Sequence, residues 1–409
     1  MSRRVAILGA GPSGCFVAQA LLKARPELQV DILDRLPVPY GLVRYGVAAD
    51  HQGTKAITRQ FARLFERQGA RFFGNVTVGR EVTLEALREA YDAVVVATGL
   101  SADRRLGIPG DDLPGVHGAG RITRALYEHP DAEPLPPLGA RPLIVGNGNV
   151  AIDLLRLLAK TPEELDGSDL GPGPTAWLAG SGIEEITILG RSPAAAARFD
   201  AVMLKELGRL SGVSIAVDDP GTAGTEEGLR VLEALSALHG HGHGTGPRRI
   251  RFVFSRRPVA AEGEGQVSAL LCAAPDGREE RFAATSILTA IGFDGETATA
   301  ESGAAVRMAP GLYGAGWFAR GPRGTIPDNR ADAQALAAVI LADLDAMPAG
   351  APRGEILACL PGVVTYDGWT RIDAAETAGP PPGRCRAKIT GRAAMLSLAA
   401  ARDEKETQP

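Results

Sequence analysis

Two glycine-rich turns, each directly after an apolar run, constrain what this chain can fold into. Gly9-Ala-Gly-Pro-Ser-Gly14 follows Val5–Leu8, and Gly146-Asn-Gly-Asn-Val-Ala151 follows Leu143–Val145. Glycine lets the backbone turn tightly off a buried strand and approach a pyrophosphate, whose charge then lies at the N-terminus of the next helix. The chain holds 51 glycines, so one such motif alone would be weak evidence. The strand before and the helix after each turn favour two dinucleotide sites.

The strand that follows each motif ends on a different kind of side chain. Leu28–Leu33 ends at Asp34, which is placed to accept hydrogen bonds from a ribose diol. Ile186–Leu189 ends at Gly190-Arg191, where a guanidinium suits a 2′-phosphate. The sequence therefore predicts a plain ribose at the first site and a phosphorylated one at the second. The alternative for the second motif is a turn that is kept for packing alone.

Length and composition limit the class of protein. A chain of 409 residues that is 45% apolar can build two or three domains, and a net charge of -4 indicates neither a nucleic-acid partner nor a membrane surface. No apolar run reaches the roughly 18 residues of a membrane span. Because the first strand follows Met1-Ser-Arg-Arg directly, without room for a signal peptide, we expect a cytoplasmic protein. The four cysteines form no CxxC pair, which argues against a redox dithiol.

Segments far apart in the chain indicate a nested architecture. Ala93-Val-Val-Val-Ala-Thr-Gly99 and Thr285–Gly292 both read as buried strands that end in glycine, and a strong helix is expected over 331–344. We expect the second dinucleotide domain to be inserted into the first, with the C-terminal segment returning to complete the first domain. The loop His239–Gly246 alternates histidine with glycine; we interpret it as a surface loop and assign no metal.

Five stretches of this chain resemble one known family. They are Gly9–Gly14, Pro37-Val-Pro-Tyr-Gly-Leu-Val-Arg-Tyr-Gly-Val-Ala-Ala-Asp-His51, Gly146–Asp153, Trp317–Ile326, and Trp369–Asp373 with Met395-Leu396. Together they resemble the adrenodoxin reductase type of ferredoxin-NADP reductase over nearly the whole chain. The resemblance implies an α/β fold of two Rossmann-like dinucleotide-binding domains, with an NAD(P)H domain (106–297) inserted into a discontinuous FAD domain (1–105 and 298–409).

The resemblance also implies roles for individual residues. Gly9, Gly11 and Gly14 would hold the FAD pyrophosphate, Asp34 the adenosine ribose, and Leu42, Trp317, Gly324, Thr325 and Ile326 would lie along the flavin. The other expected cofactor-binding residues are Pro12, Ser13, Arg35, Gly41, Arg44, Thr98 and Gly99 for FAD, and Gly146, Gly148, Asn149, Val150, Arg191 and Ser192 for the nicotinamide dinucleotide. His51 matches a family histidine close to the flavin, Asp153 a carboxylate on the nucleotide helix, and Glu206 a glutamate near the nicotinamide end. These three are the expected catalytic residues.

The second site departs from the family pattern. The family has two consecutive arginines after the strand and a glutamate four residues after a phenylalanine, whereas this chain has Arg191-Ser192 and, counted from Phe199, Met203. One arginine–phosphate contact contributes about 1.5–3 kcal/mol, so its loss relaxes discrimination between the two nucleotides. Arg198 is a candidate replacement. NADPH is the expected substrate and NADH the alternative, because Ser192 is small enough to accept a hydroxyl.

The expected electron partner and the loop near the flavin also depart from the pattern. The family's basic patch falls near 222–232, where this chain has one cation, Arg230; Arg248–Arg251 with Arg256-Arg257 could offer another basic face. The loop before Lys55 carries Ala49 and Gln52-Gly53 where the family has prolines and a glutamate.

The resemblance implies an FAD enzyme that takes hydride from NADPH, or NADH, and passes single electrons to a ferredoxin-like iron-sulfur protein. In such a reaction the protein supplies orientation and electrostatics rather than covalent chemistry. The alternative is a diverged FAD-dependent oxidase, reductase or monooxygenase that acts directly on a small organic molecule. A third hypothesis, a nucleotide-binding scaffold without turnover, conflicts with the complete set of flavin-facing segments.

Overall fold

The computed structural model describes residues 3–218, 220–241, 247–295, 306–348 and 355–401. The chain divides into two compact units: unit 1 comprises 1–101 and 294–409, and unit 2 comprises 102–293. The sequence places the first boundary at 105/106; the other predicted boundary, 297/298, lies outside the described residues. Strands β5 (Ala102–Asp103) and β15 (Phe293–Asp294) pair where the chain leaves unit 1 and returns to it.

Unit 1 is built on a six-stranded sheet in the order β16-β17-β4-β1-β2-β3. Its strands are β1 (Arg4–Leu8), β2 (Gln29–Leu33), β3 (Arg71–Phe73), β4 (Ala93–Val96), β16 (Val306–Ala309) and β17 (Leu312–Gly314). All neighbours pair in parallel except β16 with β17. β1 lies in the middle and every one of its residues is buried, as expected of a strand covered on both faces.

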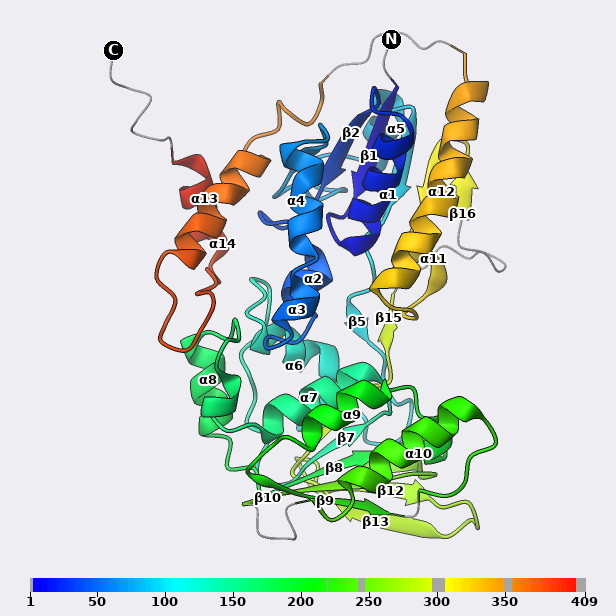
Figure 1. Cartoon of the computed structure of the whole chain (residues 1–409), viewed down its shortest axis with the longest axis vertical. Coiled ribbons are helices and arrows are strands. Elements are labelled where there is room, and N and C mark those ends of the chain that lie inside the picture. The colour runs from blue at the N-terminus through cyan, green and yellow to red at the C-terminus, as the bar shows by residue number, and fades with distance from the viewer. Residues whose placement is uncertain (1–2, 219, 242–246, 296–305, 349–354, 402–409) are drawn as a thin grey trace. The chain divides into compact units, whose positions relative to one another are not determined.

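The C-terminal segment completes this sheet. β17 pairs in parallel with β4, which places Leu312 opposite Val94 and Gly314 opposite Val96. The long helix α12 (Ile326–Ala346) then packs against α1 (Pro12–Ala24), and the two lie side by side in Figure 1. The remaining helices of unit 1 are α2 (Gly41–Tyr45), α3 (Gln52–Lys55), α4 (Thr58–Glu66), α5 (Leu84–Ala90), α11 (Trp317–Arg320), α13 (Tyr366–Thr377) and α14 (Arg392–Ala400).

Helix α12 begins earlier than its apolar pattern predicts. The pattern starts at Ala331, whereas the helix starts at Ile326. Thr325 and Asp328 form a capping box there, and Pro327 occupies the first turn, where its missing N–H costs nothing. Capping residues, rather than the apolar face, therefore set the N-terminus of this helix.

Unit 2 is built on a second, entirely parallel sheet in the order β6-β14-β7-β8-β10-β9. Its strands are β6 (Val116–Gly118), β7 (Pro142–Val145), β8 (Glu185–Leu189), β9 (Val213–Asp218), β10 (Arg248–Val253) and β14 (Ser286–Thr289). An antiparallel sheet is formed by β11 (Arg257–Glu262), β12 (Ala269–Ala273) and β13 (Glu279–Ala283). The helices are α6 (Ala119–Leu126), α7 (Asn149–Ala159), α8 (Pro172–Ala179), α9 (Ala201–Leu207) and α10 (Glu226–Leu238), with short 3-10 turns at Glu163–Leu165 and Ala194–Ala196.

The predicted fold class is confirmed: both units contain a Rossmann-like parallel sheet, and the first is assembled from the two ends of the chain. In each unit a glycine turn joins a central strand to the next helix, β1 to α1 and β7 to α7. None of the described helices combines the length and apolar character that crossing a membrane would need.

Two candidate dinucleotide sites

The first glycine turn is closed tightly against its own sheet. Gly9 has φ +109°, and a Cβ at this position would lie 2.5 Å from the carbonyl oxygen of Ala97. A Cβ on Gly14 would lie 2.0 Å from the carbonyl oxygen of Gly9. Neither position has room for a side chain, so the turn requires glycine at both. The backbone is thereby held close to where a pyrophosphate would lie, beside Thr98 and Gly99 at the end of β4.

The N-terminus of α1 is free to attract an anion. Gly11 is the N-cap, Pro12 occupies the first turn, and no acidic side chain lies in that turn. Cys15 N–H donates to the carbonyl of Gly11, which starts the helix. The first N–H groups of the helix and the positive end of its dipole therefore face no acidic side chain of the first turn itself.

Asp34 braces this turn from the end of β2. Its Oδ2 accepts a hydrogen bond from the N–H of Ala10 at 2.9 Å, and its Oδ1 accepts one from Leu36 at 2.9 Å. Burial raises the pKa of the carboxyl, while these donors and the neighbouring Arg35 act to lower it. Each carboxylate oxygen keeps a further lone pair, so Asp34 can still accept a ribose hydroxyl. The neighbouring Arg35 is exposed.

The block 37–51 folds back onto the glycine turn. Tyr40 adopts φ 81° and donates its N–H to the carbonyl of Ala10 at 2.9 Å. A Cβ on Gly41 would lie 3.0 Å from the Cα of Gly11, so the two glycines touch. Leu42 follows with 40% of its surface exposed. An apolar side chain is thus held open to a ligand directly beside the turn.

Arg44, one of the predicted cofactor-binding residues, is surrounded by protein groups. It is buried, its guanidinium pairs with the fully buried Glu376, and it lies 5.1 Å from the ring centre of Trp369. Arg386 also contacts Glu376, through Nη1 at 2.8 Å. This network ties α2 to α13, and we therefore leave Arg44 out of the residues proposed to touch a cofactor.

His51 lies at the end of this block as the N-cap of α3. It is half-buried, and its N–H donates to the carbonyl of Ala48 at 3.0 Å. Gln52, one of the departures from the family pattern, donates its side-chain amide to the carbonyl of Ala49 at 2.7 Å. In this chain the hydrogen bond from Gln52 to Ala49 therefore stabilises the loop before Lys55, where the family has prolines.

The returning C-terminal segment reaches the first glycine turn. Gly316 has φ +62°, and a Cβ there would lie 2.0 Å from Oγ of Ser13 in α1. Trp317, half-buried, begins α11 directly after it. Arg320 then fixes the next turn by pairing with Asp332 and by donating to Asn329 and to the carbonyl of Arg323. Gly324, Thr325 and Ile326 follow at the start of α12, where Asp328 folds back onto the N–H of Thr325.

The second glycine turn, in unit 2, repeats the first with one open position. A Cβ on Gly146, which has φ +133°, would lie 2.3 Å from the carbonyl oxygen of Ala290, whereas a Cβ on Gly148 would meet no protein atom within 4 Å. Gly148 is the N-cap of α7, whose first turn has no acidic residue, and Val150 lies in that turn. The space above Gly148 is therefore available to a ligand. Asn149 is engaged by the protein, since its Oδ1 accepts the N–H of Asp200 at 2.9 Å.

Arg156 links two of the predicted catalytic residues, Asp153 and Glu206. Nη2 of Arg156 donates to Oδ1 of Asp153 at 2.9 Å, and Nε of Arg156 lies 3.2 Å from Oε2 of Glu206. Arg156 is 1% exposed, so its guanidinium contacts the two carboxylates from the protein interior. Both carboxylate side chains keep part of their surface exposed to solvent. Glu206, which lies in α9 three residues after Met203, is the residue that contacts Arg156.

The end of β8 carries Arg191 exposed and Ser192 half-buried. The carbonyl of Ser192 accepts the N–H of Ser255 at 3.1 Å. Ser192 therefore stands in the place of the family's second arginine, and its backbone, rather than its side chain, holds the loop to Ser255.

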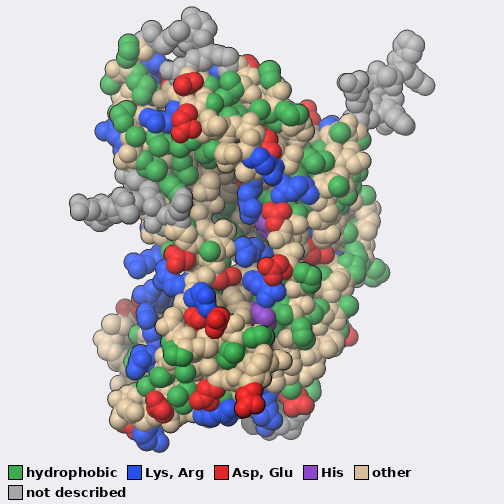
Figure 2. Space-filling model, turned by 180° about the vertical axis from the view of Figure 1, so that it is seen from behind, with side chains coloured by type: hydrophobic (Ala, Val, Ile, Leu, Met, Phe, Trp, Pro, Cys, Tyr) green, Lys and Arg blue, Asp and Glu red, His purple; other side chains and the backbone are tan. Residues whose placement is uncertain are grey.

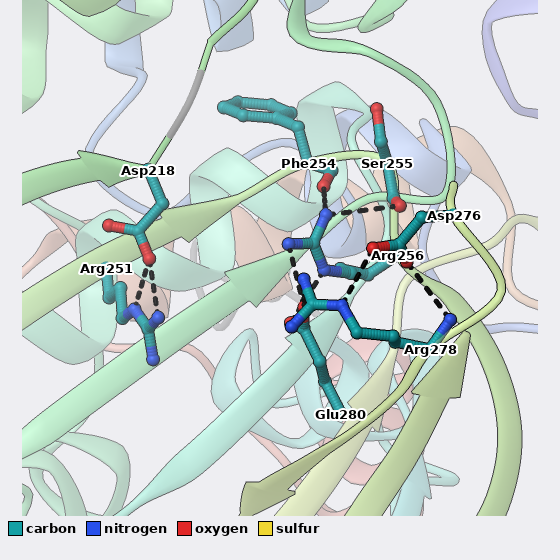
Figure 3. A network of polar contacts seen from close by, with 8 residues as sticks. All are labelled: Asp218, Arg251, Phe254, Ser255, Arg256, Asp276, Arg278 and Glu280. Carbon is teal, nitrogen blue, oxygen red and sulfur yellow. Dashed lines mark hydrogen bonds and ion pairs between the residues drawn. The ribbon is translucent and has the colours of Figure 1, made fainter. Parts of the chain in front are cut away.

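The alternative basic face suggested by the sequence is largely neutralised (Figure 3). Arg251 pairs with Asp218, Arg256 pairs with Glu280 at 2.8 Å, and Arg249 pairs with Glu185 at 3.2 Å. Arg248 donates to the carbonyls of Ala159 and Lys160. Only Arg257 of this cluster has no polar partner in the part of the chain that is described. Basic and acidic side chains are also interspersed over the face shown in Figure 2.

The histidine-glycine loop is tied down where it is described. Nδ1 of His239 accepts the N–H of Val217, and Nε2 of His241 lies 3.0 Å from the carbonyl oxygen of Leu210. Residues 242–246 lie outside the described residues. Over the described ranges, no three histidine, cysteine or acidic side chains gather as metal ligands do.

Comparisons with known proteins extend over both units. A family model described as pyridine nucleotide-disulphide oxidoreductase matches residues 3–218. Cindoxin reductase from Citrobacter braakii is 40% identical, and the alignment covers 98% of this chain and 92% of that protein. NADPH-ferredoxin reductase FprA from Mycobacterium tuberculosis is 34% identical over 96% of this chain and 98% of that protein. The solved structure of Mycobacterium tuberculosis FprA in complex with NADPH has a TM-score of 0.90, is 32% identical, and covers 98% of this chain and 100% of that one.

Proposed function

This chain belongs to the adrenodoxin reductase type of ferredoxin-NADP reductase, a family of flavoprotein oxidoreductases, and we propose that it oxidises NADPH and reduces a small iron-sulfur protein through a bound FAD. FAD, when bound, accepts the two electrons of NADPH together and releases them one at a time. The relative FprA is named an NADPH-ferredoxin reductase, and the relative from Citrobacter braakii is named a cindoxin reductase.

The residues of unit 1 fit FAD. The turn of Gly9, Gly11 and Gly14 leaves the N-terminus of α1 open to a pyrophosphate, and Asp34 stands at the end of β2 where the adenosine ribose is expected. Leu42 and Trp317, which follow Gly41 and Gly316 respectively, offer apolar surface close to that turn. These residues would bind and orient the group, and His51 would adjust the polarity near it.

The residues of unit 2 fit NADPH. The open position at Gly148 admits a pyrophosphate at the N-terminus of α7, and Arg191 offers a cation at the end of β8. Asp153 and Glu206, held by Arg156, would orient the nicotinamide end by accepting hydrogen bonds from it. One observation carries the proposal: each unit contains a glycine turn, and the next strand of its sheet ends at a charged residue suited to one nucleotide. That residue is Asp34 in unit 1 and Arg191 in unit 2.

The acceptor is the finer part of the proposal. In α10, where the family has its basic patch, Glu226 and Glu227 fill the first turn and Arg230 pairs with Glu226. We therefore expect an iron-sulfur partner to dock elsewhere on this chain, or to be less acidic than ferredoxins usually are. A small-molecule acceptor is the remaining alternative.

The test is anaerobic mixing of the flavin-loaded protein with NADPH or with NADH while the flavin absorbance is followed. We expect rapid bleaching, faster with NADPH, and re-oxidation when a small iron-sulfur protein is added. If neither nucleotide bleaches the flavin, the proposal is wrong. Bleaching without transfer to any of several ferredoxins would assign the electrons to a small-molecule acceptor instead.

A further inference from the structure

The chain that leaves β8 lies directly against the second glycine turn. Gly146 donates its N–H to the carbonyl of Leu189 at 2.8 Å, and a Cβ on Gly190 would lie 1.6 Å from Nδ2 of Asn147. Arg191 follows immediately and is exposed. In dinucleotide-binding folds the adenosine ribose lies at the end of this strand, so Arg191 stands where a 2′-phosphate would be.

The same chain returns to the same turn seven residues later. Arg198 donates its N–H to the carbonyl of Asn147 at 2.8 Å and forms an isolated parallel bridge with Gly148. Two residues on, the N–H of Asp200 donates to Oδ1 of Asn149. The loop 191–200 therefore begins and ends beside the glycine turn, with Arg191 near one end and Arg198 near the other.

Unlike several other arginines of unit 2, Arg191 and Arg198 have guanidinium groups that no described residue neutralises. Both side chains are exposed, and no hydrogen bond or ion pair within the described ranges uses either of them. By contrast, Arg256 is neutralised by Glu280 and Arg251 by Asp218 (Figure 3). Asp200, a carboxylate in the same loop, is engaged in capping α9 through the N–H of Val202.

The side chains between the two arginines leave this surface uncovered. Ser192, Pro193 and the four alanines 194–197 are all short, and none carries a charge. A phosphate monoester carries close to two negative charges at neutral pH, and two guanidinium groups match that charge better than one.

We propose that Arg198 acts together with Arg191 to bind the 2′-phosphate of NADPH. Arg198 thereby takes over the role of the family's second arginine, whose position is occupied by Ser192 in this chain. The proposal rests on the proposed function, because it assumes that NADPH occupies unit 2. Selectivity for the phosphorylated nucleotide is then a property of the whole loop 191–198, and not of two adjacent residues at its start.

The test uses the flavin-loaded full chain and isothermal titration with two probes, adenosine 2′,5′-bisphosphate and AMP. The wild type is expected to bind the bisphosphate at least about tenfold more tightly, the range of one charge-assisted contact. Arg198→Ala should remove about tenfold or more of that affinity and leave AMP binding unchanged. Arg249→Ala is the matched control, because it removes an exposed arginine at the opposite, amino end of the same sheet.

A second variant tests the proposal even if Arg198→Ala disturbs the folding of the loop 191–200. Ser192→Arg in the Arg198→Ala background restores the family's arginine pair, and we expect it to recover bisphosphate binding. Unchanged discrimination in Arg198→Ala, or an equal loss of AMP and bisphosphate binding, would overturn the proposal. Flavin reduction of the wild type by NADPH separates the two questions, since its failure would refute the proposed function itself.

Discussion

A Cβ at Gly316 would lie 2.0 Å from Oγ of Ser13, although the two residues are far apart in the sequence. Ser13 is in the first turn of α1, and Gly316 directly precedes Trp317. The contact explains how a C-terminal segment can complete a site that an N-terminal turn begins. The close approach requires glycine for two reasons, the space and the φ of +62°.

Gly316→Ala is therefore expected to weaken FAD binding and to lower the melting temperature. The backbone conformation of Gly316, φ 62° and ψ -140°, is rarely adopted by residues with a Cβ and costs an alanine about 1–3 kcal/mol, and the clash with Ser13 adds to that. Adding Ser13→Gly removes the clash but not the conformational cost, so it should restore part of the melting temperature. FAD titration and thermal unfolding measure both effects. Gly379→Ala, where a Cβ meets no atom within 4 Å, is the control; equal losses with and without Ser13→Gly would contradict the expectation.

Gly148→Ala tests the second turn without disturbing the fold. Because a Cβ at Gly148 meets no protein atom within 4 Å, the variant should unfold at the wild-type temperature and keep its flavin. The methyl group would instead occupy space that a pyrophosphate needs, so the half-saturating NADPH concentration in flavin reduction should rise about tenfold or more. Gly173→Ala, equally free of contacts in the same unit, should change nothing. Normal NADPH saturation in Gly148→Ala would place the nucleotide elsewhere.

Arg156→Met tests whether the buried guanidinium positions Asp153 and Glu206. Methionine keeps apolar volume in a buried position but leaves both carboxylates without their cation. We expect the maximal rate of flavin reduction by NADPH to fall at least about tenfold, since small displacements of orienting groups carry such costs. Stopped-flow absorbance separates this rate from nucleotide affinity. Arg209→Met removes an exposed arginine just after α9 and should have no effect; a wild-type rate in Arg156→Met would show that the pairing has no role in orientation.

The sequence allowed the glycine turns, Asp34 and the returning segment to be predicted, because each depends on local backbone geometry or on an apolar run. Three features could not be read in this way. Arg156 meets Glu206 only because α7 packs against α9, and Arg44 is buried only because Glu376 approaches from α13. Asn149 follows a motif for nucleotide binding, yet its side chain holds the loop at Asp200. The one local signal was the i,i+3 spacing of Asp153 and Arg156 on a helix.

The buried Glu376 makes stability depend on pH. Burial by itself would raise the pKa of this carboxyl, but the charge of Arg44 and hydrogen bonds from Arg44, Ile389 and Arg386 lower it below its ordinary value. A carboxyl whose pKa is lower in the folded state stabilises the fold above its unfolded-state pKa, and this contribution is lost as the pH falls through the folded-state value. The loss therefore begins below about pH 4.5, the ordinary value.

Glu376→Gln should destabilise the protein at neutral pH, because it leaves Arg44 buried without a carboxylate, a change that typically costs about 3–5 kcal/mol. The variant also lacks the titrating group, so its free energy of unfolding should fall less steeply than that of the wild type when the pH is lowered below about 4.5. Urea unfolding at several pH values measures both quantities. Glu89→Gln, which changes an exposed carboxylate in the same unit, should follow the wild-type profile. Parallel pH profiles for Glu376→Gln and the wild type would show that the Arg44–Glu376 pair does not couple folding to protonation.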